Sequence, residues 1–193
     1  MASGNLAVTG DPAADRLVNT EPLALLLAMM LDQQVTMEWA FMGPLRLQER
    51  LGGSLDAKSI AAMDPEDLEA AFKEKPALHR YPGSMAKRAQ ELSQHLVDNY
   101  DGEAGNVWKG VRNADVLFER MTAIPGYGEE KSKIFIAILA KRFDKQPAGW
   151  QEYAGPFADD SPRSVADIDG PESLDTVRQW KKAQKAKGKS KQD

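Results

Sequence analysis

The stretch from Met121 to Lys131, MTAIPGYGEEK, constrains the fold most strongly because it predicts two helices joined by a tight turn. Pro125 has no amide hydrogen, so the first helix must end before it. Gly126 and Gly128 can both adopt the positive φ angles that a sharp reversal needs and that most residues resist. Two glutamates follow directly, and carboxylates are favourable in the first turn of a helix.

A turn of this kind also has a chemical use. Its glycines bring backbone amides to the surface at the positive end of a helix, where an anion such as a DNA phosphate can bind. The same pattern also occurs as a plain connection between packed helices, because short motifs of this length are only weakly specific. The hairpin alone therefore leaves both interpretations open.

Helical periodicity extends over the rest of the chain. The nine apolar residues Leu23–Leu31 predict a buried helix over residues 22–31, far shorter than the ~20 residues of a membrane span. Further helices are predicted over residues 37–51, 57–62, 65–72, 85–99 and 172–186. Residues 144–171 are rich in Pro, Gly and Asp and are expected to be irregular. Strand signals are absent, so we predict an all-α fold.

Composition excludes several classes of protein. The 193 residues contain no cysteine, which rules out disulfides, cysteine-bound zinc and an iron–sulfur cluster, so we expect no such cofactor. His79 and His95 lack partners at metal-ligand spacing and are expected at the surface or at an edge. Without a signal pattern, the chain is expected to be soluble and cytoplasmic.

The charge is distributed unevenly. The whole chain carries −4, but residues 178–193 contain seven Lys or Arg and one Asp, so residues 1–177 carry −10. An acidic body argues against an extended nucleic-acid surface. Any DNA contact must therefore rely on a local face, on backbone amides or on the lysine-rich tail.

Three segments taken in order resemble the helix-hairpin-helix (HhH-GPD) DNA glycosylase superfamily. They are the apolar helix that runs into Leu31-Asp32-Gln33-Gln34-Val35-Thr36, the helix that starts near Tyr81 and continues through Ala86-Lys87, and the Ile124-Pro125-Gly126-Tyr127-Gly128 turn. The resemblance covers about Pro22 to Glu152. It implies a two-lobed helical domain, which we assign to residues 22–171. The composition of the flanking segments predicts a loose N-terminal arm or short helix (1–21) and a C-terminal helix with a lysine-rich tail (172–193).

The resemblance also implies how such a protein would act. Duplex DNA binds across the cleft between the lobes, and the reactive base is rotated out of the stack. Backbone amides of Gly126, Tyr127 and Gly128 would hold a phosphate, and the Ile124–Gly128 carbonyls would hold a monovalent cation. Gln33 and Gln34 occupy the position of the wedge that fills the gap in the duplex, although a helix-end glutamine can equally cap backbone groups. The basic residues after the turn could contact phosphates: Lys131, Lys133, Lys141 and Arg142.

The reaction needs a carboxylate, because breaking the N-glycosidic bond develops positive charge on the sugar. The family's aspartate aligns without gaps with Ala148, which cannot act. Aligning on Pro147 instead makes Glu152 the candidate acid. Asp144 lies close to the preceding helix, and Asp159 and Asp160 lie far along the loop, which makes them weaker alternatives.

A second family position holds the lysine that forms a Schiff base in glycosylases with lyase activity. Here that position holds Glu130, and Lys131 lies one residue further on, about 100° around the helix. The resemblance therefore implies a glycosylase without lyase activity. Among the aromatic residues, Trp150 is predicted to stack on the flipped base, whereas Trp39 and Phe41 are predicted to lie in the core.

Taken together, the sequence predicts a monomeric DNA N-glycosylase of base excision repair that acts on double-stranded DNA. One alternative is a family member that binds damaged or distorted DNA without cutting it. Another, favoured by the acidic body, is a helical interaction module unrelated to DNA.

Overall fold

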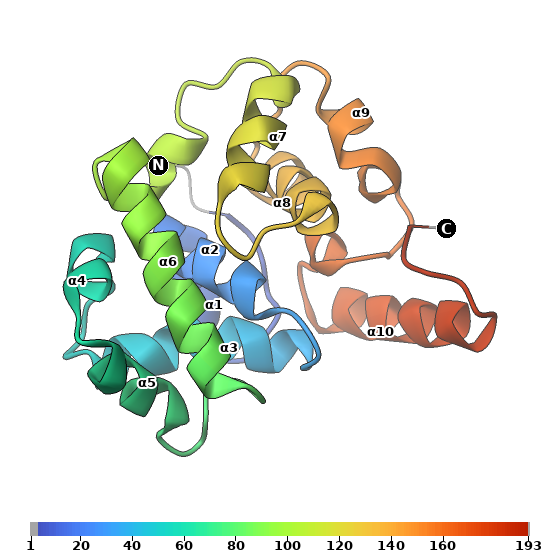
Figure 1. Cartoon of the computed structure of the whole chain (residues 1–193). Coiled ribbons are helices and arrows are strands. Elements are labelled where there is room, and N and C mark those ends of the chain that lie inside the picture. Colours follow the sequence, from blue (N-terminus) through green and yellow to red (C-terminus); the bar gives the residue numbers. More distant parts are fainter. Residues whose placement is uncertain (1–3, 193) are drawn as a thin grey trace.

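The computed structural model describes residues 4–192, and helices account for its regular structure (Figure 1). The α-helices are α1 (Pro12–Thr20), α2 (Pro22–Leu31), α3 (Met37–Arg50), α4 (Ala57–Ala62), α5 (Pro65–Lys73), α6 (Pro82–Tyr100), α7 (Ala114–Ala123), α8 (Glu129–Arg142), α9 (Trp150–Ala154) and α10 (Pro171–Ala186). Short 3-10 helices are η1 (Ala104–Val107), η2 (Gly155–Ala158) and η3 (Val165–Asp167). Residues 4–192 contain no β-strand, and the predicted all-α fold is confirmed.

The helix α2 lies at the centre of the first group of helices. Every residue of Leu23–Leu31 is at most 8% exposed, as expected for a helix that is apolar on all sides. Helices α1 and α3 pack against it. Leu6 and Val8 are also buried, and Asp11 caps α1. The segment expected to be a loose arm or a short helix therefore contains α1 and contributes to the core.

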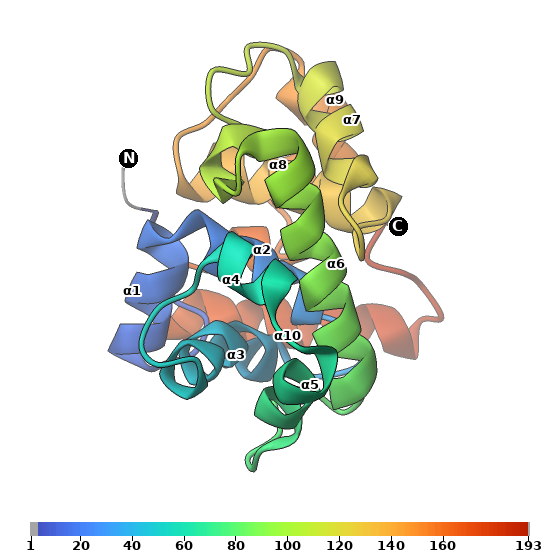
Figure 2. The same cartoon turned by 60° about the vertical axis from the view of Figure 1, so that its left-hand side comes forward.

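The longest helix, α6, packs against α4 and α5, which lie together beside it in Figure 2. It begins at Pro82, three residues before the predicted start. Proline is favourable at the first helical position because its fixed φ suits a helix and its missing amide would be unpaired there.

The predicted hairpin forms from α7, the turn and α8. The segment Ile134–Ala140 of α8 is buried on all sides, since α7, α9, η2 and η3 surround it. The stretch between α8 and α10 is less irregular than expected, because it contains α9, η2 and η3. The chain then continues through α10, and residues 187–192 return towards the start of α8 (Figure 1).

An ion pair and a sulfur contact attach α10 to the first group of helices. Arg178 forms an ion pair with Glu38, and Lys181 Nζ lies 3.1 Å from Met37 Sδ. Because α10 also packs against η3, it bridges the helices around α2 and the elements around α8. None of the helices within residues 4–192 is both long enough and apolar enough to span a bilayer.

Candidate nucleic-acid interface and excision site

The two glycines of the hairpin have different conformations. Gly126 has φ +87°, and a Cβ placed there would lie 3.2 Å from Met30 Cγ. Gly128 has φ −98° and ψ −177°, so the positive φ that the sequence allowed at this position does not occur. Gly128 instead precedes the first turn of α8, and a Cβ there would meet no atom within 4 Å. Gly126 thus makes the turn, while Gly128 faces open space at the positive end of a helix.

Tyr127 fixes the turn to the core. Its side chain is 5% exposed, and its hydroxyl donates a hydrogen bond of 2.8 Å to the carbonyl of Leu26 in α2. Its ring meets Phe135 edge-on, with ring centroids 5.9 Å apart. Burial raises the pKa of the phenol well above its usual value. A ring held in this way packs in the interior, so a DNA contact at this residue would come from its backbone.

Lys131 forms a second tie between the hairpin and α2. Its Nζ donates to the carbonyls of Met29, at 2.7 Å, and Met30, at 2.6 Å. These carbonyls belong to the last turn of α2, which lacks helical donors and attracts cations. Burial is the main cause that lowers the pKa of Lys131 to about 8, although the charge of Asp32 opposes the shift. The lysine therefore points towards α2 rather than outwards to phosphates.

The corner after α2, where the resemblance places the wedge, is held by a histidine. His79 is 2% exposed, so the expectation of a surface or edge position is wrong. Its Nδ1 accepts from the amide of Tyr81 at 3.0 Å, and its Nε2 lies 2.8 Å from the carbonyl of Gln33. A carbonyl only accepts, so Nε2 carries the proton and the ring is neutral. Burial, the largest cause, lowers the pKa of His79.

The wedge residues themselves differ in exposure. Gln33 is half-buried, whereas Gln34 is exposed and has φ +55°. Its Oε1 lies 3.5 Å from the hydroxyl of Tyr81, which is 43% exposed. A positive φ in a residue other than glycine is uncommon and projects the side chain away from the helix direction. Of the two wedge residues, Gln34 is therefore the exposed one.

A cavity of about 460 Å³ joins this corner to the start of α8 and to the C-terminal segment. Residues 32–35, Glu130 and residues from α10 and the tail line it: Trp180, Lys181, Gln184, Lys185, Lys189, Ser190 and Lys191. Two carboxylates, Asp32 and Glu130, therefore face the same space as the wedge residues. The sequence did not indicate that these two acids converge, because they are almost a hundred positions apart.

Glu130 is bound to the tail. Its Oε1 lies 2.8 Å from Lys191 Nζ, and its Oε2 accepts from Gln192 Nε2 at 2.9 Å. Burial would raise the pKa of Glu130, but the hydrogen bond and the charge of Lys191, with Gln192, outweigh it and hold the pKa below its usual value. The acid at the family's lysine position is thus ionised and partnered.

The candidates on the loop after α8 lie elsewhere. Glu152 is exposed in the first turn of α9, and Trp150 is half-buried and packs against the core. The backbone of Ala148 bridges to Arg112 and Ala114, which fixes the loop beside the start of α7. Asp159 is paired with Arg163 at 2.9 Å. Neither Glu152 nor Trp150 lines the cavity at the wedge, and their predicted roles stay predictions.

The remaining basic residues after the turn are engaged in ion pairs. Lys133 pairs with Glu129, Lys141 with Asp167 at 2.7 Å, and Arg142 with Asp169 at 2.9 Å. Lys141 is ten residues beyond Lys131, about 15 Å along α8 at the usual rise. The C-terminal end of α8 is therefore remote from the hairpin turn.

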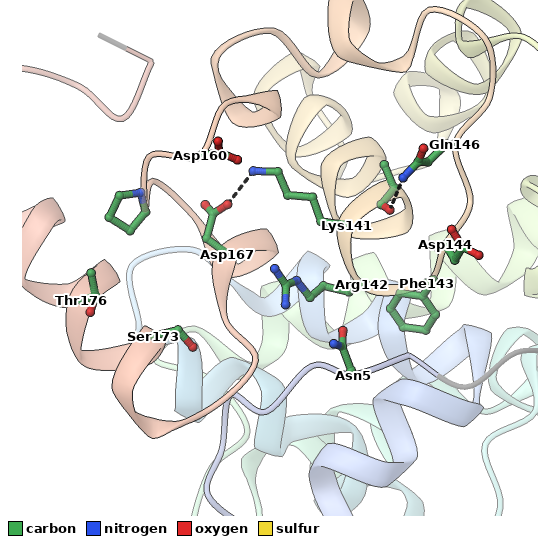
Figure 3. Close-up of a pocket in the computed structure, with 12 residues that line it drawn as sticks. Asn5, Lys141, Arg142, Phe143, Asp144, Gln146, Asp160, Asp167, Ser173 and Thr176 are labelled. Carbon is green, nitrogen blue, oxygen red and sulfur yellow. Dashed lines mark hydrogen bonds and ion pairs between the residues drawn. The ribbon is translucent and has the colours of Figure 1, made fainter.

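Figure 3 shows this distant region, in which Lys141 points towards Asp167 beside a cavity of about 790 Å³. Asp144 and Asp160 line the same cavity. The weaker alternatives for the catalytic acid therefore lie at the far end of α8. The lysine and arginine there are already neutralised by carboxylates.

Two aromatic residues near the wedge differ in burial. Phe41 is fully buried, as predicted, but Trp39 is 37% exposed, so the core position expected for it is wrong. The guanidinium of Arg46 lies 4.4 Å from the centre of the Trp39 ring. An indole can remain at the surface when a cation covers one face of it.

Carbonyl oxygens of the turn determine how a monovalent cation would fit. The Ile124 carbonyl accepts from the amide of Tyr127, and the Gly128 carbonyl accepts from both the amide and the hydroxyl of Ser132. A carbonyl oxygen has two lone pairs, so Ile124 retains one and Gly128 uses both. Ile124 thus fits a cation better than Gly128 does. No group of three His, Cys, Asp or Glu side chains within residues 4–192 could hold a metal ion.

Comparison with known protein families matches residues 27–191 to the HhH-GPD superfamily base excision DNA repair protein family. The chain belongs to this superfamily, and base excision repair with DNA binding follows from that membership. The resemblance inferred from the three sequence segments is thereby confirmed. No curated protein and no solved structure matches the chain.

Proposed function

We propose that this protein is a DNA N-glycosylase without lyase activity that uses Glu130 as its principal carboxylate. The observation that carries the proposal is the shared cavity of Glu130, Asp32 and the wedge corner. In the family pattern, the residue at position 130 is the one that reaches the reacting sugar. A carboxylate at this position can stabilise positive charge on C1′ but cannot form a Schiff base.

The chemistry follows from that placement. When the C1′–N bond breaks, its electron pair stays on the departing base and the sugar becomes an oxocarbenium ion. The Glu130 carboxylate stabilises this cation, and a water molecule then adds to C1′ and gives its proton to Asp32, while the departing base takes up a proton from solvent. Asp32, which lines the same cavity, would also orient that water. Double-stranded DNA is the proposed substrate, and we propose that a monomer acts on it without an organic cofactor.

Lys131 supports the absence of lyase activity. Although a pKa of about 8 leaves part of the amine neutral near pH 7, its Nζ is held by two carbonyls of α2. We therefore expect no covalent adduct when the protein is mixed with abasic DNA and borohydride. An adduct that disappears in Lys131→Met would instead establish a lyase.

The main experiment is single-turnover base release from duplexes that carry alkylated, oxidised, deaminated or mismatched bases. We expect Glu130→Gln to slow release by about a hundredfold or more, as loss of transition-state charge stabilisation does. The matched control is Glu129→Gln, which changes the neighbouring carboxylate, paired with Lys133 on the exposed side. That variant is expected to release the base at nearly the wild-type rate.

Glu152→Gln tests the acid predicted from sequence. If release is lost in this variant and retained in Glu130→Gln, the proposed assignment is wrong and α9 carries the acid. If no duplex releases a base while lesion binding persists, the protein is a family member that binds damage without cutting it. Ala148 at the family's aspartate position would then explain the missing activity.

A further inference from the structure

The C-terminal segment, residues 181–192, lies over the candidate site rather than extending away from the molecule. Lys191 and Gln192 bind Glu130, and Arg163 Nη1 lies 3.4 Å from the carbonyl of Lys191. Lys189 is also fixed, because its amide donates to the carbonyl of Gln184 in α10. A tail that only kept the protein soluble would need none of these contacts.

The charge of the cavity is unusual for an acidic protein. Four lysines line it, namely Lys181, Lys185, Lys189 and Lys191, against the carboxylates of Asp32 and Glu130. The body formed by residues 1–177 carries −10, so this is a local concentration of positive charge. It adjoins the wedge corner, where the family membership places DNA. Phosphates are the anions that such a position would meet.

The contact with Glu130 is readily exchanged. In the Lys191–Glu130 pair the side chains are 36% and 37% exposed, so water screens their attraction. Exposed ion pairs contribute little net stability. A phosphate that approaches the cavity can therefore replace the carboxylate as the partner of Lys191 at small cost.

From these observations we propose that residues 181–192 form a clamp for the DNA backbone next to the flipped base, which the free protein holds over the cleft through Glu130. The clamp rests on the proposed function, since DNA must enter the cavity that Glu130 and the wedge corner line. When DNA phosphates bind the lysines, the Glu130 carboxylate is released from Lys191 and can face the sugar. The exchange of partners at Lys191 therefore couples DNA binding to exposure of the Glu130 carboxylate.

The first test is a salt titration of the full-length protein on a duplex with a stable abasic analogue, followed by fluorescence anisotropy. The variant Lys185→Gln/Lys189→Gln removes two lysines and leaves the Lys191–Glu130 pair intact. If both contact phosphates, the log–log salt slope should fall by about 2, with affinity more than tenfold weaker near 100 mM salt. The matched control is Lys58→Gln/Lys73→Gln, which removes two exposed lysines on α4 and α5 and should not change the slope. An unchanged slope in the first variant would overturn the clamp.

The second test measures the exchange at Glu130. Glu130→Gln should tighten DNA binding several-fold at low salt, because Lys191 loses its competing partner. In a Lys191→Gln background that gain should disappear. A gain that persists there reflects only the removal of an acidic charge and would contradict the exchange.

The two proposals can fail separately. Base release is not needed for either binding measurement, so a protein that binds but does not cut can still show the predicted slope and coupling. Conversely, base release that depends on Glu130, together with an unchanged slope in the tail variants, would leave the glycosylase in place and remove the clamp.

Discussion

The two hairpin glycines provide a pair of substitutions that should separate stability from DNA binding. Gly126→Ala places a Cβ on a residue with φ +87°, 3.2 Å from Met30 Cγ. Gly128→Ala places one on a residue with φ −98°, with no atom within 4 Å. The chemical change is identical in both, so the local geometry alone decides the difference.

The expected magnitudes follow from the backbone. The left-handed region costs an L-residue about 1–2 kcal/mol, and the reduced freedom of the unfolded chain returns about 0.4–1 kcal/mol. The Met30 side chain must also shift, so we expect Gly126→Ala to destabilise the fold by roughly 1 kcal/mol or more. This corresponds to a melting temperature about 2–4 °C lower for a chain of this size. Gly128→Ala should be neutral or slightly stabilising, because its φ suits alanine.

DNA binding should show the opposite order. If the amides at the start of α8 hold a phosphate, a methyl group at residue 128 projects into that space and should weaken binding several-fold. Gly126→Ala, measured well below its melting temperature, should bind closer to the wild type. Urea denaturation and fluorescence anisotropy on an abasic duplex measure the two effects. Wild-type affinity in Gly128→Ala would refute phosphate docking at the hairpin, and wild-type stability in Gly126→Ala would refute the strain argument.

Three further substitutions test the contacts that position the site. Tyr127→Phe removes the hydrogen bond to Leu26 and should lower the free energy of unfolding, measured by urea denaturation, by about 1 kcal/mol. The control is Tyr153→Phe, because the Tyr153 hydroxyl has no hydrogen bond within the described residues. This variant should lower the free energy of unfolding by less. The pKa of His79 is lowered from 6.5 in the folded protein, so the unfolded chain binds more protons and the free energy of unfolding should fall as the pH drops below about 6.5. His79→Gln should flatten this pH dependence. An unchanged dependence of stability on pH in the variant would show that His79 is not responsible. The pKa of Lys131 is lowered from 10.5 to about 8, so the stability of the wild type relative to Lys131→Met should rise as the pH increases from about 8 to 10.5. A stability difference that stays constant over this range would contradict the burial of this amine.

Much of the fold could be predicted because hydrophobic periodicity and residues that end helices or form turns act locally. The apolar run Leu23–Leu31 could only be a buried helix, and Pro125 with Gly126 could only end one helix and reverse the chain. Local signals were less reliable where tertiary packing competes with them. Trp39 is large and apolar, which favours a core position, yet it lies at the surface with a cation over one face of its ring. Helix α6 begins at Pro82, three residues before the predicted start.

The candidate site was only partly within reach of sequence reasoning. The order of the three motif segments identified the family, and the offset from Gly128 marked Glu130 as unusual. Which acid faces the wedge could not be read in this way, because Asp32 and Glu130 come from separate helices and meet only when these pack. The ion pair between Lys191 and Glu130 could not be predicted either, because the two residues are 61 positions apart in the chain.

The helical class and the hairpin were predictable because each depends on residue types within one or two helical turns, and the family was recognised from the order of three such short segments. Three features became visible only in the folded protein: Tyr127 and Lys131 bind the hairpin to α2, His79 holds the corner, and the lysine-rich tail covers the acid. The physical reason is that periodicity specifies which face of a helix is buried but not which residue it meets. Those partners are set when distant helices pack together and their polar groups must be satisfied.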